Sequence, residues 1–233
     1  MNIHPLIKSF FNVYCNYLNR EWHLNSPIGQ PVFDEYGGER FRICPPGLSS
    51  DELDQINSFL PSGKFLPQSF VAFLSAYRFA EFTSPLIEFY PTLEDGFNEI
   101  TIPAMRFHSH LGLLAFATSE NGGESFCLDF RSQKAPQVVL CRPGLKPGTV
   151  QIIDGMFSSF EILIRILHRA FEEPQSTFVE ETKTFSNLEF FRSLAELDPE
   201  GFGGPGWTTR WSQWLIRDSV DVSSLPFPKR KDA

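Results

Sequence analysis

Hydrophobic side chains recur every three or four residues near the start of the chain. Between His4 and Trp22 they fall at Leu6, Ile7, Phe10, Phe11, Tyr14, Leu18 and Trp22. This spacing places them along one side of a helix, and Pro5 fits the first helical turn. The pattern predicts an amphipathic helix over residues 4–22. A loop rich in Pro, Gly and Asp follows over residues 25–46, with at most one short strand near Phe41–Cys44.

Three further segments carry helix signals. Ser49 can cap a helix that has Glu52 three residues later and ends before Pro61. Pro67 can occupy the first turn of the next helix, over residues 66–77. Residues 157–173 return to helical spacing after a long interval, and either Ser158 or Ser159 can cap that helix. The last pattern is apolar enough to predict packing against a sheet.

Short runs rich in β-branched and aromatic residues occupy the middle of the chain. They cover residues 86–90, 99–107, 111–118, 124–130, 137–143 and 149–153. No helix-length spacer separates them, so an antiparallel meander is expected. Residues 121–123, Asn-Gly-Gly, suit a hairpin turn. In the strand that follows, Phe126, Leu128 and Phe130 alternate with smaller or polar residues, which predicts one core-facing side.

These patterns predict an α+β fold: an antiparallel sheet of about six strands packed by helices, with helical N- and C-terminal extensions. We expect residues 1–47 to pack on a core of residues 48–173, and residues 174–233 to form the C-terminal extension of one folded unit. The chain of 233 residues is 42% hydrophobic and contains 25 Phe. A core of that size folds without disulfides or metal.

Cysteine spacing and hydropathy bear on the location of the protein. Cys15, Cys44, Cys127 and Cys141 show no CxxC pair and lie in apolar segments, which favours reduced thiols in the cytoplasm. No apolar run reaches the roughly 20 residues that span a bilayer, so no membrane association is expected.

Charge is unevenly distributed along the chain. The formal net charge is −8, and residues 51–130 carry eleven acidic and three basic residues. This balance argues against a nucleic-acid partner, because phosphate binding requires clustered Lys and Arg. The acidic segment is either a solvated surface that aids solubility or a surface that attracts a basic protein.

The order of several segments resembles the SUKH superfamily. After the helix capped by Ser49 come LPQSFVAFL (66–74), LLAFATSENGGESFCLDFR (113–131), VVLCRP (138–143) and SSFEILIRIL (158–167). The family has an LP-x(5)-FL helix, a hairpin with Gly-Gly followed six residues later by Asp, a Val-rich strand and a closing helix with a Ser-Phe start. The resemblance implies an α+β protein-binding domain. In this family such domains often act as bacterial immunity proteins that block a toxin, commonly a nuclease, and some relatives are cell-wall regulators.

Signals for catalysis or metal binding are weak. His108 and His110 would share one side of a strand, but zinc needs a further ligand such as Glu99, Glu120 or Cys127, and nothing in the sequence places one nearby. The glycine-rich residues 201–206 lack the ending of a phosphate-binding loop, and no nucleophile motif is present. We therefore expect no enzyme activity, cofactor or metal. An unrecognised hydrolase that uses His108 and His110 is kept as the weakest hypothesis.

Three tryptophans mark the C-terminal extension. In a helix, Trp207, Trp211 and Trp214 would form a single stripe at positions i, i+4 and i+7. The stripe either packs back onto the domain or anchors a partner or a second copy of the chain.

The leading hypothesis is an immunity protein that neutralises a cognate toxin by binding and occluding it. The partner is expected to be a basic protein, and the chain itself to be a monomer or homodimer. The alternative is a non-inhibitory adaptor or regulatory scaffold. The candidate partner-binding residues are Glu81, Glu88, Glu94, Asp95, Glu99, Glu120, Glu124, Trp207, Trp211 and Trp214.

Overall fold

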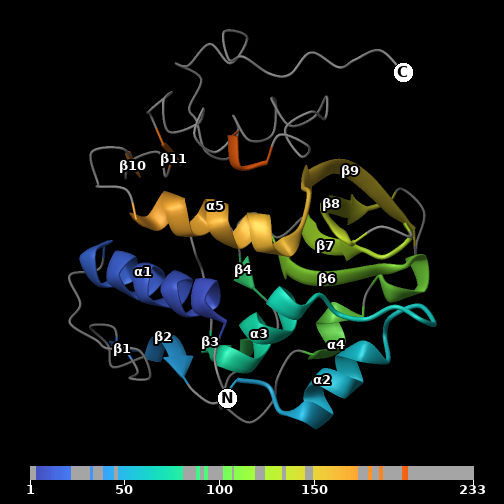
Figure 1. Ribbon diagram of the computed structural model, residues 1–233, viewed down its shortest axis with the longest axis horizontal. Helices are drawn as coiled ribbons and strands as arrows, with labels where there is room; N and C mark the ends of the chain where they lie inside the picture. The colour runs from blue at the N-terminus through green and yellow to red at the C-terminus, as the bar shows by residue number, and fades with distance from the viewer. Residues whose placement is uncertain are drawn as a thin grey trace, which may run out of the picture.

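An antiparallel sheet packed by helices forms the centre of the computed structural model of the chain (Figure 1). The structure describes residues 4–21, 32–33, 39–44, 47–80, 88–89, 92–93, 102–106, 108–118, 124–132, 135–144, 149–172, 178–179, 184–185 and 196–198. The α+β prediction is confirmed for this part of the chain. Among the described residues, no helix has both the length and the hydrophobicity needed to cross a membrane.

The main sheet has five strands in the order β4-β6-β7-β8-β9, and every neighbouring pair is antiparallel. The strands are β4 (Glu88–Phe89), β6 (Leu113–Thr118), β7 (Ser125–Asp129), β8 (Gln137–Pro143) and β9 (Val150–Phe157). From β6 onward they follow chain order, as the short spacers predicted. The pairing of β6 with β7 confirms the predicted hairpin, although its turn, residues 119–123, lies outside the described residues.

The two faces of the main sheet differ in the size of their side chains. Phe126 and Leu128 of β7 face the large core shared with the helices. On the other face, a second buried cluster consists of Leu113, Ala115, Cys127, Val139 and Cys141. The alternation expected for residues 124–130 is therefore present, with a smaller apolar layer opposite the aromatic one.

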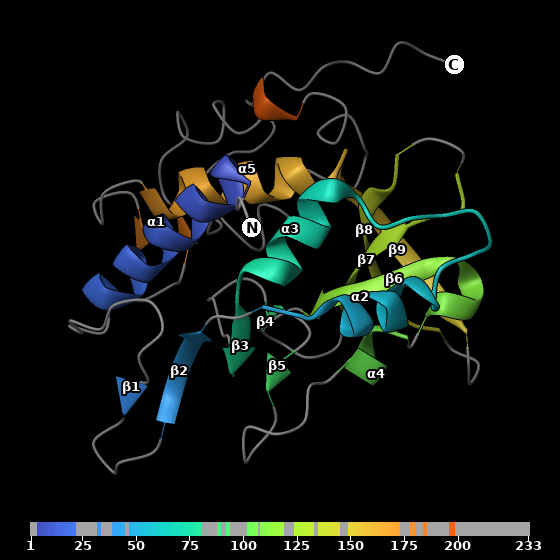
Figure 2. The ribbon, with the colours of Figure 1, turned by 60° about the horizontal axis from the view of Figure 1, so that its bottom comes forward.

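Helix α1 (Pro5–Glu21) lies alongside α5 (Phe160–Glu172), as both ribbon views show (Figure 2). The Phe171 ring of α5 lies 5.0 Å from that of Tyr14 and 4.7 Å from that of Tyr17, measured between centroids. Complete burial raises the pKa of Tyr14, because the phenolate would lose its hydration, and Tyr17 and Cys15 add to the shift. The Ser159 hydroxyl accepts a hydrogen bond from the Ile162 amide at 3.2 Å, so Ser159 caps α5.

Helices α2 (Ser50–Asn57) and α3 (Gln68–Ala76) begin where the sequence predicts. Ser49 and Glu52 form the expected capping box: the Ser49 amide donates to Glu52 Oε2 at 2.7 Å, and the Glu52 amide donates to Ser49 Oγ at 3.3 Å. In α3, Phe70 is fully buried and its ring centroid lies 5.8 Å from that of Phe116 in β6. Helix α3 thereby joins the helical layer to the sheet.

Smaller sheets surround this centre. Strands β1 (Val32–Phe33), β2 (Glu39–Cys44), β3 (Arg78–Ala80) and β5 (Thr92–Leu93) form a second sheet, in which β3 and β5 are parallel. Strands β10 (Phe178–Val179) and β11 (Thr184–Phe185) pair with each other. The predicted strand near Phe41–Cys44 is present as the end of β2.

Several sequence predictions need correction. The region predicted as loop, residues 25–46, contains β1 as well as β2. Among the described residues the main sheet has five strands, where about six were predicted. The predicted strand over residues 99–107 is wrong, because α4 (Ile102–Met105) is helical. Ile102 and Met105 lie three residues apart and are both buried, which suits one helical turn and not the alternation of a strand.

One described residue of the C-terminal region packs against the domain. Asp198 is 1% exposed, and its Oδ2 accepts a hydrogen bond of 2.9 Å from the Ser158 amide, just before α5. The helical N-terminus carries partial positive charge, which favours a carboxylate there. Within the predicted helical extension, residues 178–179 and 184–185 are not helical, because they form the paired strands β10 and β11. The Trp stripe lies outside the described residues.

Candidate partner-binding surface

Only two of the ten predicted partner-binding residues are described. Glu88 lies in β4 and Glu124 directly precedes β7. The remaining eight, which lie outside the described residues, are Glu81, Glu94, Asp95, Glu99, Glu120, Trp207, Trp211 and Trp214.

The sheet register places Glu88 and Glu124 on either side of the same end of β6. Thr118, at the end of β6, pairs with Glu88 on one side and with Ser125 on the other. The Thr118 hydroxyl also donates a hydrogen bond of 3.1 Å to the Glu124 carbonyl oxygen. Two acidic residues 36 positions apart in sequence thus flank the same end of β6. We call Glu88 and Glu124 the acidic sheet end.

The opposite end of β6 is built around an ion pair that the sequence did not reveal. Arg131 Nε donates to Asp129 Oδ1 at 2.9 Å, and Arg131 Nη2 donates to Oδ2 at 2.6 Å. Burial alone would raise the pKa of Asp129, but the hydrogen bonds and charge of Arg131 outweigh burial and lower it. Asp129 is the acid of the hairpin motif, so the motif acid fixes the end of β7 here.

Three segments meet at this end of β6. Gly112 has φ of 73°, which favours glycine, and a Cβ there would come within 3.0 Å of Arg131 Cγ. The Phe130 amide donates to the Gly112 carbonyl at 2.9 Å. Lys64 Nζ donates to the Ser132 carbonyl at 2.6 Å, which ties the loop between α2 and α3 to the same place.

This tied loop exposes a large aromatic side chain. Phe65 is 80% exposed, although Leu66 beside it is buried. Leu111, in the 3₁₀ helix η1 (Ser109–Leu111) before Gly112, is also exposed. On one side of Phe65 the Lys64 side chain is bonded to Ser132, and on the other side Leu66 is buried. The exposed ring between them is typical of a contact residue more than of a core residue.

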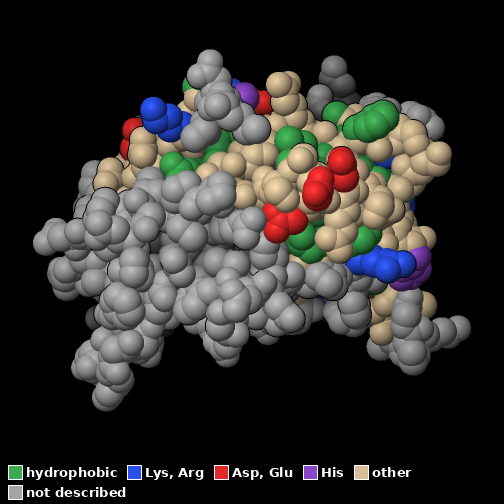
Figure 3. Space-filling model, turned by 90° about the horizontal axis from the view of Figure 1, so that it is seen from below, with side chains coloured by type: hydrophobic (Ala, Val, Ile, Leu, Met, Phe, Trp, Pro, Cys, Tyr) green, Lys and Arg blue, Asp and Glu red, His purple; other side chains and the backbone are tan. Residues whose placement is uncertain are grey.

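Acidic and basic side chains share the face seen from below, the side on which Figure 1 shows α2 (Figure 3). Asp51 and Asp54 of α2 are exposed on its surface. Arg106, directly after α4, is also exposed, and its guanidinium carbon lies 5.8 Å from the centroid of the Phe59 ring. Because Phe59 follows α2 in the chain, this contact places a cation close to the acidic helix.

His108 and His110 do not share one side of a strand, which corrects the basis of the metal-site hypothesis. They lie at the start of η1, where His108 is buried and His110 is exposed. Burial lowers the pKa of His108, and the neighbouring His110 lowers it further. Among the described residues, no group of three His, Cys, Asp or Glu side chains could hold a metal ion.

Cys15, Cys127 and Cys141 are buried or partly buried thiols. Cys127 and Cys141 lie on the same face of β7 and β8. The hydrogen bond with Cys141 raises the pKa of the Cys127 thiol, and burial raises it further. A thiol that resists ionisation is a poor nucleophile and metal ligand.

A Ser-His-Glu arrangement joins α1 to α5. Ser9 Oγ and His168 Nε2 are 2.8 Å apart, and His168 Nδ1 lies 3.7 Å from Glu172 Oε2. The second distance exceeds that of a hydrogen bond. Ser9 also sits within α1, where backbone amides are bonded to carbonyls four residues earlier and cannot stabilise an oxyanion. We assign this contact to helix packing.

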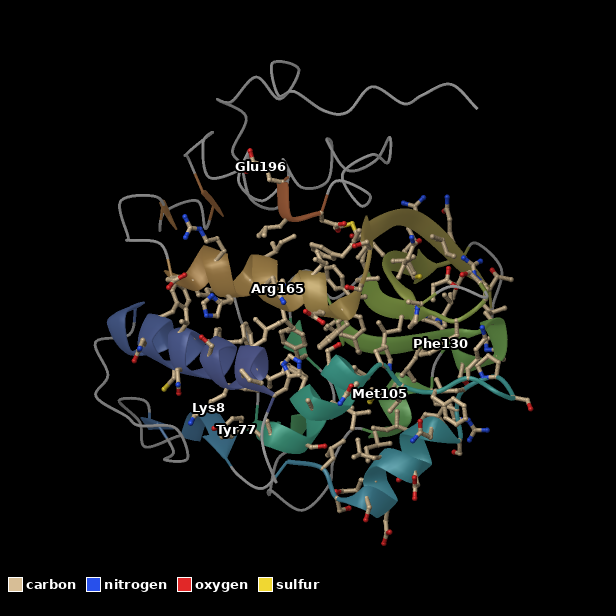
Figure 4. All side chains as sticks on the ribbon, viewed as in Figure 1. Lys8, Tyr77, Met105, Phe130, Arg165 and Glu196 are labelled. Atoms are coloured by element: carbon tan, nitrogen blue, oxygen red, sulfur yellow. The ribbon has the colours of Figure 1, made fainter. Side chains whose placement is uncertain are left out.

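Side chains from the helices and the sheet fill the space between them, as the stick view shows (Figure 4). The two surfaces with features of a contact site therefore lie outside this core, at opposite ends of β6. Comparisons of the chain with protein-family models, with curated proteins and with solved structures found no match to any of them.

Proposed function

We propose that this chain is a protein-binding domain that acts as an immunity protein. In this proposal it binds a cognate toxin with a basic surface in the cytoplasm and occludes the toxin's working site, without a cofactor. The observation that carries the proposal is that Glu88 and Glu124 flank the same end of β6, which we call the acidic sheet end. Sequence charge alone did not require these residues to flank one strand end.

The proposal draws on the resemblance to the SUKH superfamily. The segments that carry the resemblance form α2, α3, β6, β7, β8 and α5. Buried residues from all six belong to one hydrophobic cluster. The six segments that carry the resemblance therefore pack together in one unit.

Electrostatics supports a basic partner. Residues 51–130, which include the acidic sheet end, carry eight more acidic than basic residues. Opposite charge speeds the encounter of two proteins and disfavours partners of the same sign. A toxin that grips nucleic-acid phosphates presents such a basic surface, so an acidic binder can cover it.

Co-expression tests the proposal directly. The full chain is purified together with the product of the adjacent gene, and binding and toxin activity are measured separately. We expect a stable complex in which the toxin is inactive. No association at micromolar concentration would contradict the proposal. Association without inhibition would contradict the immunity role and favour the adaptor.

Variants of the acidic sheet end locate the surface in such a complex. We expect the double substitution Glu88→Gln and Glu124→Gln to slow association about threefold or more, with a smaller change in dissociation, because charge acts mainly on the encounter. Glu196→Gln is the matched control, since Glu196 is exposed elsewhere on the chain. Equal association rates for the double variant and the control would exclude this surface.

A further inference from the structure

We propose that the face formed by α2 and the Phe65 loop binds a second copy of the chain across a twofold axis. We call it the α2–Phe65 face and define it by Asp51, Asp54, Phe65, Arg106 and Leu111. It lies toward the end of β6 opposite the acidic sheet end. The inference goes beyond the proposed function and does not depend on it.

The apolar part of this face consists of the exposed side chains of Phe65 and Leu111. Phe65 is 80% exposed and Leu111 37% exposed. The Phe65 loop is tied to the end of β7 by the Lys64 hydrogen bond to Ser132, and Gly63 within it adopts φ of 77°. A loop that is already tied in place loses less conformational freedom when a partner covers it. Phe65 therefore has the properties of an anchor.

The charged part of this face carries both signs. Asp51 and Asp54 are exposed on α2, and α4, which ends just before Arg106, packs against α2. The contact of Arg106 with Phe59 keeps the guanidinium beside the end of α2. Figure 3 shows acidic side chains in the middle of this face, and basic and histidine side chains toward its lower right edge.

A second copy is the partner that fits adjacent patches of opposite sign. A basic partner would bring its charge against Arg106, and an acidic partner would bring its charge against Asp51 and Asp54. In a twofold interface the same surface is used by both copies, so that residue i of one meets residue j of the other and the reverse. Each acidic helix then faces the other copy's Arg106, and both signs are matched.

Sedimentation equilibrium of the full chain tests this interface. Over roughly 1 to 100 µM, the range of a moderate dimer affinity, we expect the mass to rise from that of the monomer to twice that value. A monomer at every concentration overturns the proposal. Binding of a toxin is measured separately, so the proposed function can fail while the dimer stands.

Phe65→Ser tests the anchor. Because the ring is exposed in the monomer, the variant should unfold at the same temperature when dilute, yet weaken the dimer about tenfold or more. Leu197→Ser is the matched control: Leu197 is also an exposed apolar side chain, but it lies outside the α2–Phe65 face. A Phe65→Ser variant that dimerises like the control overturns the proposal.

A charge exchange tests the twofold arrangement. Asp54→Arg and Arg106→Asp, each alone, place like charges across the axis and should weaken the dimer. Circular dichroism checks that each variant is folded. The double variant restores opposite charges and should recover most of the lost affinity. If the double variant dimerises no better than the single ones, the two groups do not face each other and the proposed geometry is wrong.

Discussion

At the scale of single residues, the Asp129–Arg131 pair is an ion pair joined at two points. Two parallel hydrogen bonds join the groups, and the Asp129 side chain is only 15% exposed. We expect Asp129→Asn to lower the free energy of unfolding by about 1–2 kcal/mol, since a charge-assisted two-point contact is lost. Urea unfolding near neutral pH measures this change.

The same pair predicts a pH dependence. The pKa of Asp129 is lowered in the folded state, so its contribution is fully present above the unfolded value of about 4 and is lost as pH falls through the folded pKa. The difference between the wild type and Asp129→Asn should therefore shrink in acid. Glu161→Gln removes a half-exposed pair with Arg165 and should change stability by less than about 0.5 kcal/mol. Equal losses in both variants would mean that the Asp129 pair has no special role.

His108 makes a second prediction at this scale. Its pKa is lowered by burial and then by His110, so the unfolded chain binds a proton that the folded chain rejects just below about pH 6.5. The free energy of unfolding should fall as pH drops through this window. His108→Gln should make the fall shallower. Urea unfolding at a series of pH values measures the slope, and an unchanged slope in His108→Gln would refute this assignment.

At the scale of elements, ring contacts hold α1 against α5. Phe171 is buried and its ring lies near those of Phe10, Tyr14 and Tyr17. We expect Phe171→Ala to lower the free energy of unfolding by about 3–5 kcal/mol, because it leaves a cavity between the helices. Ser9→Ala, which removes the hydrogen bond with His168, should cost only about 0.5–1.5 kcal/mol. Chemical unfolding compares them, and a Phe171→Ala loss no larger than that of Ser9→Ala would contradict this packing.

Elements with local signals could be predicted from the sequence, and those set by distant partners could not. The capping box of α2 requires only Ser49 and Glu52, so the start of this helix is readable. Helix α4 has four residues, too few to show the three- to four-residue spacing of hydrophobic side chains that marks a helix. The composition of residues 99–107 therefore suggested a strand. Strand β3 also has no local signal, because its pairing with β2 is made across more than thirty residues.

The candidate surfaces follow the same division. Sequence counting located the acidic segment, but only the pairing of β6 with both β4 and β7 shows that Glu88 and Glu124 flank the same end of β6. Phe65 gave no signal in the sequence, where one Phe among 25 resembles core. Its exposure is seen only in the folded chain, where the neighbouring Lys64 side chain reaches Ser132, 68 positions away.

At the scale of the whole molecule, Asp198 connects the C-terminal region to the start of α5. Its buried Oδ2 accepts the Ser158 amide, where the helix end favours negative charge. Asp198→Ala leaves that amide without its carboxylate, and we expect the free energy of unfolding to fall by about 1–3 kcal/mol. If the contact holds the C-terminal region in place, limited proteolysis should cut after residue 198 faster in the variant while residues 47–172 stay intact. Glu196→Ala, two residues away but exposed, serves as the control. Equal cleavage rates in the two variants would show that the C-terminal region is held by other contacts.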